Sequence, residues 1–439
     1  MKRVLLLLTA FLLTVHGMAR SGERWPDGQP IDRWFADTAL TAPHRLGNRY
    51  VITDFGVLKD STLVQTKAIQ RVIDEASDRG GGVVVIPDGT FLSGSLFIRK
   101  GVNLQVEAGG KLKGSDRIED FPIMETRIEG QTCQYFAALI NADQTDGFIL
   151  AGPGTIDGNG LNYWKEFWLR RQWNPDCTNK DAQRPRLVYI SRASNVRIEN
   201  IRLQNSPFWT THLYRCRRVK MLRCSIFAPT EGVKAPSSDA IDVDVCSDIH
   251  VYGCHMSVND DAVALKGGKG TWADRAPENG SNERILIENC HYRRVHSCLT
   301  LGSESVHDRN VILRKSQCDD VNRVLWLKMR PDTPQRYEYV RVSEMRGNTG
   351  SFIVVRPWTQ FFSPEARPDM PLSSCQFISM ERIDMACWNF FDVGLSDKYD
   401  LRDFSFTDIK VSDRKNAFNP TLFEGIKVKN LTINNQPVP

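Results

Sequence analysis

The chain has 439 residues, of which 41% are hydrophobic and 25% charged, and its formal net charge at pH 7 is +5. A chain of this length can bury a large core without covalent cross-links. The small net charge and the lack of a basic run with interleaved aromatic residues give no sign of a nucleic-acid partner.

The N-terminus has the pattern of a secretory signal peptide. Lys2 and Arg3 precede an apolar run at residues 4–15, and a small-residue site ends at Ala19. The apolar run is shorter than the roughly 20 residues needed to cross a bilayer. We predict that residues 1–19 are a signal peptide, that the mature chain is secreted or periplasmic, and that it has no membrane span.

The next part of the chain is predicted to contain an extension and a helix. Residues 20–50, with Trp25 and Trp34, are expected to form an N-terminal extension, and residues 51–439 a catalytic domain. Residues 66–77 place apolar side chains on one face of a helix that ends at a run of three glycines. We expect this helix to cap the open end of the domain, where an uncovered sheet edge could pair with other chains.

The main domain is built from repeats of short β-type runs. One series starts at residues 187, 211, 240, 262, 299, 324 and 352, with steps of 24, 29, 22, 37, 25 and 28 residues. A second series, starting at residues 195, 218, 248, 284 and 310, interleaves with the first. Neither a leucine-rich consensus nor the four strands of a propeller blade is present. We predict an all-β fold, a single-stranded right-handed parallel β-helix with two strands per repeat.

Four of the eleven cysteines, Cys224, Cys254, Cys290 and Cys318, close the same strand in successive repeats. A buried column of free thiols is favoured over disulfides or a metal site, because the cysteine count is odd and the CxxC spacing typical of zinc is absent.

Three carboxylates are expected to meet on one edge of the β-helix. Residues one coil apart on equivalent strands stack about 4.8 Å apart. Asp239 and Asp261 each precede an equivalent strand and lie 22 residues apart, with Asp260 beside them. Clustered acids raise one another's pKa, which suits general acid catalysis. We predict a catalytic cluster whose carboxyl groups reach the spacing of roughly 6.5 to 9.5 Å that inverting glycosidases need. The alternative is an Asp-Asp pair that only marks a turn.

Several other side chains on the strands around the acid cluster can be interpreted as functional or as structural. His296 and Lys328 lie on the next coils at the same edge, where they would orient the acids or face an anionic sugar, or are ordinary exposed residues. Trp209, Trp326 and Trp358 are either core residues or platforms for sugar rings. Asp242 and Asp244 alternate with apolar residues and are expected to be surface acids facing outward.

Several segments in order resemble the polygalacturonase-type glycoside hydrolases (family 28), which are pectin-degrading β-helices. The resemblance covers roughly residues 51–429 and rests on residues 52–56, 80–87, 152–158 and 205–212, and on Ser237-Ser238-Asp239 and Asn259-Asp260-Asp261. It implies that Asp260 is the general acid and that Asp239 and Asp261 activate water, in an inverting hydrolysis without a metal or other cofactor. His296 matches the histidine of the third family motif.

The fourth family motif, Arg-Ile-Lys, is changed here to Trp326-Leu327-Lys328. In the family, the Arg and Lys bind a galacturonate carboxylate together, and a lysine cannot replace the planar fork of an arginine. A Trp at this position favours an apolar sugar face such as that of rhamnose. The substrate-binding residues expected from these considerations are Lys328, Trp326, Trp209, His212, Lys266, Arg330 and Arg356, of which Lys266, Arg330 or Arg356 would restore a carboxylate contact.

We therefore expect a monomeric, inverting hydrolase of α-glycosidic bonds in pectic polysaccharide, with rhamnogalacturonan or a complex side chain as the favoured substrate. Insertions at residues 267–281 and 164–184 flank the expected site, and closure of one end of the cleft by them would give exo-action. Two alternatives remain open, a calcium-dependent polysaccharide lyase on the same fold and a glycan-binding β-helix without catalytic activity.

Overall fold

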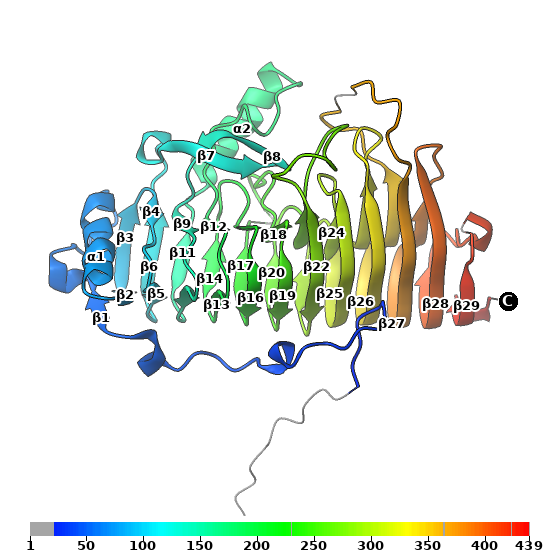
Figure 1. Cartoon of the computed structure of the whole chain (residues 1–439), viewed down its shortest axis with the longest axis horizontal. Helices are drawn as coiled ribbons and strands as arrows, with labels where there is room; N and C mark the ends of the chain where they lie inside the picture. The colour runs from blue at the N-terminus through cyan, green and yellow to red at the C-terminus, as the bar shows by residue number, and fades with distance from the viewer. Residues whose placement is uncertain (1–21, 230, 363–364, 423, 439) are drawn as a thin grey trace, which may run out of the picture.

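The computed structural model describes residues 22–229, 231–362, 365–422 and 424–438, whose strands wind into one long parallel β-helix (Figure 1). One sheet contains 28 strands, and a separate two-stranded sheet stands above it as a hairpin. The predicted parallel β-helix is thus confirmed. The predicted signal peptide, residues 1–19, lies outside the described residues.

Each coil of the first two thirds of the β-helix has three strands, which stack in three columns. The first column holds β4 (Leu96–Phe97), β9 (Ile140–Asp143), β12 (Val188–Ser191), β15 (Thr211–Tyr214), β18 (Ile241–Asp244), β21 (Val263–Lys266) and β24 (Leu299–Leu301). The second holds β1 (Arg49–Val51), β2 (Gly82–Ile86), β5 (Val102–Val106), β10 (Ile149–Ala151), β13 (Arg197–Glu199), β16 (Arg217–Leu222), β19 (Ser247–Tyr252) and β22 (Ser281–Glu288).

The third column holds β3 (Gly89–Ser93), β6 (Gly110–Gly114), β11 (Thr155–Asp157), β14 (Arg202–Gln204), β17 (Ser225–Phe227), β20 (His255–Ser257) and β23 (His291–Arg293). Most of its later strands have only three residues, too few to show alternation, and the prediction of two strands per repeat was therefore wrong.

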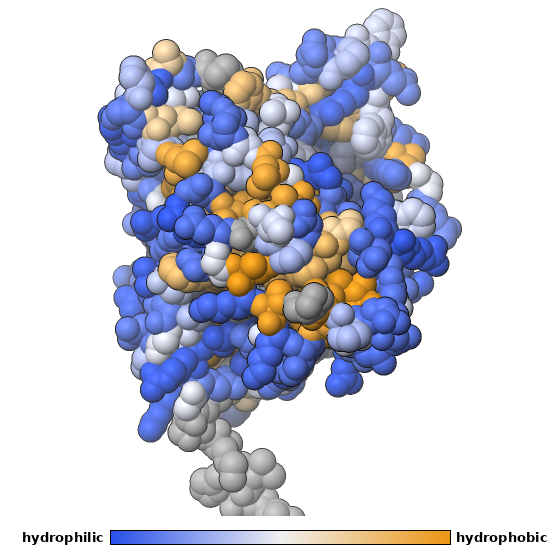
Figure 2. Space-filling model, turned by 90° about the vertical axis from the view of Figure 1, so that its right-hand side faces the viewer, coloured by the Kyte–Doolittle hydropathy of each residue, from blue (hydrophilic) through white to orange (hydrophobic). Residues whose placement is uncertain are grey.

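In the last coils the strands run on without a break, through all three columns in the first three of them and through the second and third columns in the fourth. These coils are β25 (His307–Met329), β26 (Arg336–Pro357), β27 (Ser373–Val393) and β28 (Tyr399–Asp413), followed by β29 (Lys427–Ile433) and β30 (Gln436–Pro437). The hairpin consists of β7 (Ile123–Ile128) and β8 (Gln131–Phe136). Figure 2 shows apolar side chains gathered in the middle of the face at the C-terminal end.

The register of the first column corrects two of the predicted strand starts. The structure aligns Val188, Thr211, Ile241, Val263, Leu299, Leu325 and Ile353 in successive coils. The spacings are therefore 23, 30, 22, 36, 26 and 28 residues. The other predicted starts each lie one residue before the aligned position, whereas those at residues 211 and 299 lie on it. These two starts were therefore one residue too late relative to the others. The spacing of 22 between the coils that carry the acids is the predicted one.

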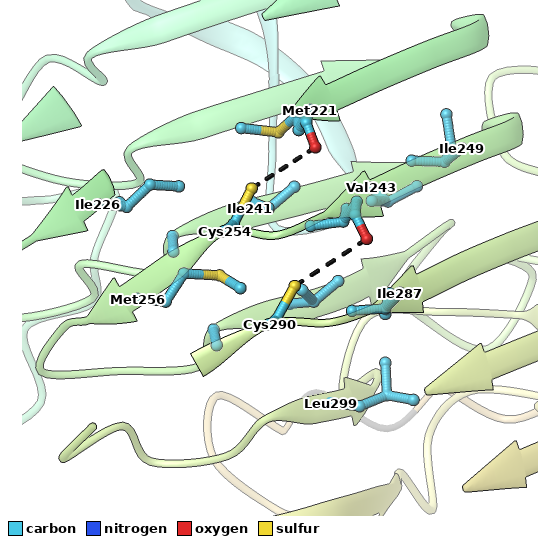
Figure 3. Packing of buried hydrophobic residues seen from close by; sticks show 14 of the residues in the cluster. Met221, Ile226, Ile241, Val243, Ile249, Cys254, Met256, Ile287, Cys290 and Leu299 are labelled. Atoms are coloured by element: carbon cyan, nitrogen blue, oxygen red, sulfur yellow. Dashed lines mark hydrogen bonds between the residues drawn. The ribbon is translucent and has the colours of Figure 1, made fainter. Parts of the chain in front are cut away.

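The core is a ladder of side chains that point into the coil. Figure 3 shows apolar side chains such as Ile241, Val243 and Leu299 meeting there with cysteines. All eleven cysteines are unpaired and ten are buried. The thiol of Cys254 donates to the carbonyl of Met221, two residues of neighbouring coils, at 3.5 Å. The predicted column of buried free thiols is confirmed for Cys224, Cys254 and Cys290. It was wrong for Cys318, which is buried but aligns with Tyr292, while Ser316 takes the position opposite Cys290.

Helix α1 and the N-terminal extension have clear roles in the fold. Helix α1 (Thr66–Asp78) packs against β2, β3 and β4 with Ile69 and Val72 buried, as expected for a cap. The extension runs along the bottom of the β-helix in Figure 1. Its residues Trp25 and Phe35 pack on Leu286 and Ile312 of the second column. It therefore ties several coils together, a role that the sequence left undefined. Its short 3-10 helices are Arg33–Ala36 and Pro43–Leu46.

Removing a buried side chain from the ladder should destabilise the protein far more than removing an exposed one of the same type. Ile287 in β22 is fully buried, whereas Ile123 in β7 is 62% exposed. We expect Ile287→Ala to lower the free energy of unfolding by about 2–5 kcal/mol, and Ile123→Ala by less than about 0.5 kcal/mol. Urea unfolding followed by circular dichroism measures both. Equal losses would show that this side chain does not belong to the core.

Candidate active site

The site lies where the chain passes from the third column back to the first. Asp239 lies two residues before β18, and Asp260 and Asp261 lie three and two residues before β21 in the next coil. The amide of Ala240 donates to the carbonyl of Asp261 at 2.9 Å, so the two turns are held together by the ladder of the sheet itself. The backbone, and not a flexible loop, therefore sets the position of the acids.

The three acids crowd together more closely than the sequence suggested. One carboxylate oxygen of each of Asp239, Asp260 and Asp261 lies within 4.8 Å of the others. The expected separation of roughly 6.5 to 9.5 Å was therefore wrong. The reason is that the coils are in register, so equivalent acids sit at about the strand spacing of 4.8 Å instead of on a diagonal.

The three acids have different surroundings. Asp261 is fully buried, and its two oxygens accept hydrogen bonds from the Ser297 hydroxyl and the Lys328 ammonium, each at 2.8 Å. Burial alone would raise the pKa of Asp261, but the charge and hydrogen bond of Lys328 lower it to about 2. Asp261 is thus charged at neutral pH.

Asp239 has the opposite character, although it lies one coil away. It is 4% exposed, and burial together with the negative charge of Asp260 raises its pKa well above the ordinary value. The Asp260 side chain is 26% exposed and faces Nδ1 of His296 at 3.3 Å. Burial lowers the pKa of His296, but the hydrogen bond and charge of Asp260 outweigh it and raise this pKa. The cluster therefore combines a charged acid, an acid that tends to keep its proton, and an acid open to solvent.

These residues border a cavity of about 460 Å³. It brings together, among the residues predicted for the site, Asp239, Asp260, His296, Lys328, Lys266, Trp209 and Trp326, as well as Trp358. Asp261 lies beneath the cavity wall rather than in its lining. Trp209 also packs in a cluster with Ile128, Tyr135 and Phe208, so it serves the core and the cavity at once.

Three predicted substrate-binding residues do not line this cavity. His212 is fully buried, where Arg186 contacts its Nδ1 at 2.6 Å and burial lowers its pKa to about 4. Arg330 is buried and pairs with Asp332 at 2.7 Å. Arg356 is exposed and pairs with Asp392 outside the cavity. The prediction that these three line the substrate cavity is not met, because the sequence does not reveal the segments that cover or pair them.

Asp242 and Asp244 are also corrected, since both are fully buried rather than on the surface. They do point away from the coil interior, but other parts of the chain cover them. Arg127 of β7 donates to Asp244 at 3.1 Å, and the ammonium of Lys266 lies 3.8 Å from Asp242. Burial raises the pKa of Asp242 well above the ordinary value.

Two arginines of the cavity were missed by the sequence analysis. Arg323, in β25, holds its guanidinium 3.9 Å from the ring centre of Trp326, and Lys328 lies 4.2 Å from the same ring. Arg171 reaches the cavity from α2 (Leu161–Trp173), which stands beside the hairpin in Figure 1. Arg323 lies three residues before Trp326, outside the family motif, so motif comparison could not identify it.

The spacing of the three carboxylates would also allow them to approach a metal ion. However, the ammonium of Lys328 already occupies one oxygen of Asp261, and Lys266 and His296 stand close to the cluster. These cations oppose a divalent ion electrostatically. The donor set thus fits a proton-transfer site better than a metal centre.

Comparisons with known proteins agree with this arrangement. The family model described as "Glycosyl hydrolases family 28" matches residues 83–316, which is more than half of the chain. The chain is 27% identical over 226 residues to a probable polygalacturonase of Vitis vinifera, covering 49% of this chain and 44% of the relative. It is 28% identical over 268 residues to an endo-polygalacturonase of Pectobacterium carotovorum, covering 58% and 62%.

A probable endo-xylogalacturonan hydrolase A of Aspergillus fumigatus is 27% identical over 208 residues, 46% of each chain. The chain thus spans 44% to 62% of the length of these curated relatives. Among solved structures, an exopolygalacturonase of Thermotoga maritima has a TM-score of 0.68 at 20% identity, covering 88% of this chain and 91% of the other. The polygalacturonase of Erwinia carotovora has a TM-score of 0.62 at 20% identity, covering 87% and 93%. These likenesses show the shared fold.

The pair of Lys328 and Asp261 should make stability depend on pH. A carboxyl whose pKa is lowered by folding adds stability above its unfolded pKa of about 3.9, and this stability is lost as the pH falls through the folded pKa. Lys328→Met leaves the buried Asp261 without its cation and should raise the pKa of Asp261. We expect the variant to lose about 3–5 kcal/mol at neutral pH, and the difference from wild type to shrink toward acid pH. Lys328→Arg, which keeps the charge, is the control.

Urea unfolding of the three proteins between pH 7 and pH 3 measures this effect. A loss that is independent of pH would contradict the role of the ion pair.

Proposed function

Because the chain belongs to glycosyl hydrolase family 28, we propose that it hydrolyses α-glycosidic bonds beside uronic acid residues of a pectic polysaccharide. The observation that carries this proposal is the cluster of three carboxylates in different surroundings, with Asp239 and Asp260 in the cavity lining, Asp261 beneath it and several cations beside them. The curated relatives named above are described as polygalacturonases or as a xylogalacturonan hydrolase, which supports a pectic substrate.

In the proposed reaction, one proton is shared between Asp239 and Asp260. Asp260 is the member open to the cavity, so it passes this proton to the glycosidic oxygen as the bond to the anomeric carbon breaks. A water molecule attacks the anomeric carbon from the other side, and its proton passes to Asp239, which is left as a carboxylate when Asp260 gives up the shared proton. Asp261 supplies the fixed negative charge that favours this step. His296 contacts Asp260 and is placed to return a proton from solvent.

We propose inversion at the anomeric carbon, since both oxygens of Asp261 are held by Ser297 and Lys328, and the buried Asp239 takes up the proton of the attacking water. Neither acid is then a free nucleophile for a covalent intermediate. The close spacing of the acids does not itself support inversion by the usual distance rule, so the anomer of the product must be measured directly.

The cavity suits an acidic sugar even though the family arginine is absent. Arg323, Arg171, Lys266 and Lys328 all reach it. Arg323 and Lys328 both pack against the ring of Trp326, so the Trp that replaces the motif arginine positions another arginine. Arginine binds carboxylates through a planar fork. We therefore favour a uronate over rhamnose in this part of the cavity, while the aromatic faces leave room for a neutral neighbour, as in rhamnogalacturonan or a branched chain.

The β7–β8 hairpin borders the cavity on its N-terminal side, which supports exo-action (Figure 1). The β7–β8 hairpin lies across the first column, where Arg127 contacts Asp244 and Arg186 contacts Thr126 of β7 at 2.6 Å. The turn residue Glu129 lines the cavity. Residues 267–281, predicted to close the cleft, support the hairpin instead, since Asn279 accepts a hydrogen bond from Arg127 at 2.6 Å. Residues of α2 and the loop after it line the cavity, as expected for the insertion at 164–184.

We further propose that the protein acts outside the cytoplasm, on the strength of the signal-peptide pattern at residues 1–19. We also propose that it acts as a monomer. Among the described residues, no helix is long and apolar enough to cross a membrane. Sequencing the N-terminus of the mature protein and measuring its mass in solution test these two points.

Removing the proposed general acid should abolish turnover without unfolding the protein. We expect Asp260→Asn to reduce kcat on pectic oligosaccharides by about 10²–10⁴-fold, with unchanged thermal stability within a few degrees. Asp88→Asn, whose side chain is 78% exposed on an early coil, is the control and should keep full activity. Reducing-end release measures both variants. Full activity of Asp260→Asn would exclude the proposed role.

Removing the replacement arginine should weaken the binding of charged substrates selectively. Arg323→Ala loses a charge-assisted contact worth about 1.5–3 kcal/mol, so we expect kcat/KM on oligogalacturonates to fall roughly 10–100-fold. The loss should be smaller on a methyl-esterified substrate, which lacks the carboxylate. A matched loss on both substrates would show that Arg323 serves the structure and not the recognition of uronate.

A further inference from the structure

A second cavity, of about 410 Å³, lies outside the active site at the third strand column. β14, β17, β20 and β23 each contribute to it, and its lining residues are Arg202, Gln204, Asn205, Phe227, Ala228, Pro229, His255, Ser257, Arg293 and Arg294. None of these residues lines the active-site cavity. The second cavity is therefore a separate feature of the surface.

The lining of the second cavity carries positive charge only. It includes three arginines and one histidine, and no carboxylate among the described residues that border it. Arg202 packs its guanidinium 4.3 Å from the ring centre of Phe227, and Arg294 lies 3.9 Å from Asp320, whose side chain is 85% exposed. Concave surfaces lined by one sign of charge attract ligands of the opposite sign. This cavity therefore favours an anion.

Two neighbouring histidine rings, tilted by 54° to each other, lie beside this charge. The rings of His255 and His291 lie 4.4 Å apart between their centres, and His291 pairs with Asp319 at 2.6 Å. Burial lowers the pKa of His255, and the positive charges of His291 and Arg293 lower it further, against a weaker effect of Asp319. An anion bound beside His255 would reverse part of this effect and raise its pKa.

The second cavity is separated from the active site by a single turn. Asn259, which lines the active-site cavity, donates to the carbonyl of Pro229, which lines the second cavity, at 2.5 Å. Ser257 and Asp260 are three residues apart on that turn, and Arg294 precedes His296 by two. A long substrate that leaves the catalytic cleft over this turn would therefore meet the arginines of the second cavity.

The dimensions also fit a chain of charged sugars. β14 and β23 are three coils apart, so Arg202 and Arg293 are separated by about 14 Å along the axis at the strand spacing. Repeated carboxylates could meet both arginines at once, and the partly exposed ring of Phe227 offers an apolar surface to a sugar ring. Resting on the proposed function, we propose that the second cavity is a non-catalytic binding site for the carboxylates of an acidic oligosaccharide.

The test follows the imidazole signals of His255 by NMR in the Asp260→Asn protein, with the His255→Asn protein used for assignment. Addition of hexagalacturonate should raise the pKa of His255, and a neutral hexasaccharide of glucose should not. The response should persist when Arg323→Ala is added, because that change affects only the active-site cavity. It should weaken at least tenfold in affinity with Arg293→Ala and Arg294→Ala together.

Arg346→Ala is the matched control. This exposed arginine continues the same stack of residues, two coils beyond His291 and outside the cavity. An unchanged His255 signal, or an equal loss in the Arg346→Ala protein, would overturn the inference. A signal that responds to inorganic phosphate as strongly as to hexagalacturonate would also overturn it, since the site would then bind any anion.

Failure of this inference can be told apart from failure of the proposed function. Turnover of pectic substrates by the wild-type protein with a silent His255 would refute the second site alone. A responsive His255 in a protein that turns over no pectic fraction would support the second site and refute hydrolysis.

Discussion

The in-register stacking of coils is the constraint on which the site depends. Backbone hydrogen bonds between neighbouring coils fix equivalent residues at about the strand spacing, and the bond from Ala240 to Asp261 extends this register into the catalytic turns. Three carboxylates are thereby forced together, which is unfavourable unless cations compensate. Lys328, two coils beyond Asp261 in the same column, supplies one such charge. The fold thus brings the mutually repelling carboxylates together and also places a cation that compensates part of their charge.

This constraint explains why the acid cluster was predictable from the sequence. In a β-helix, a spacing of 22 residues between equivalent strands translates directly into contact, so Asp239, Asp260 and Asp261 could be placed together without any knowledge of side-chain geometry. His296 was found for the same reason, because it is the equivalent of Asp260 in the next coil. Lys328 aligns with Lys266 instead and was found through the family motif. The buried thiol column was also a consequence of register, since Cys254 and Cys290 occupy equivalent positions.

Features that depend on segments outside the coils could not be predicted in this way. The β7–β8 hairpin buries His212 and Asp244, and no repeat in the sequence indicates where a hairpin folds back. Arg323 was missed because its contact is a packing interaction with Trp326 and not a motif position. The third strands escaped notice because three residues are too short for a periodic pattern. The fold and the acid cluster were thus largely predictable from the sequence. The side chains that surround the cluster, such as Arg323 and those of the hairpin, were not.

The central claim is that the stacked acids add water across a glycosidic bond. The most direct test is to digest oligogalacturonate in water enriched in oxygen-18 and to examine the products at early times by mass spectrometry and NMR. Hydrolysis as described here predicts saturated products with one heavy oxygen at the new reducing end, released with inverted anomeric configuration. Unsaturated products without heavy oxygen, as β-elimination would give, would contradict the account.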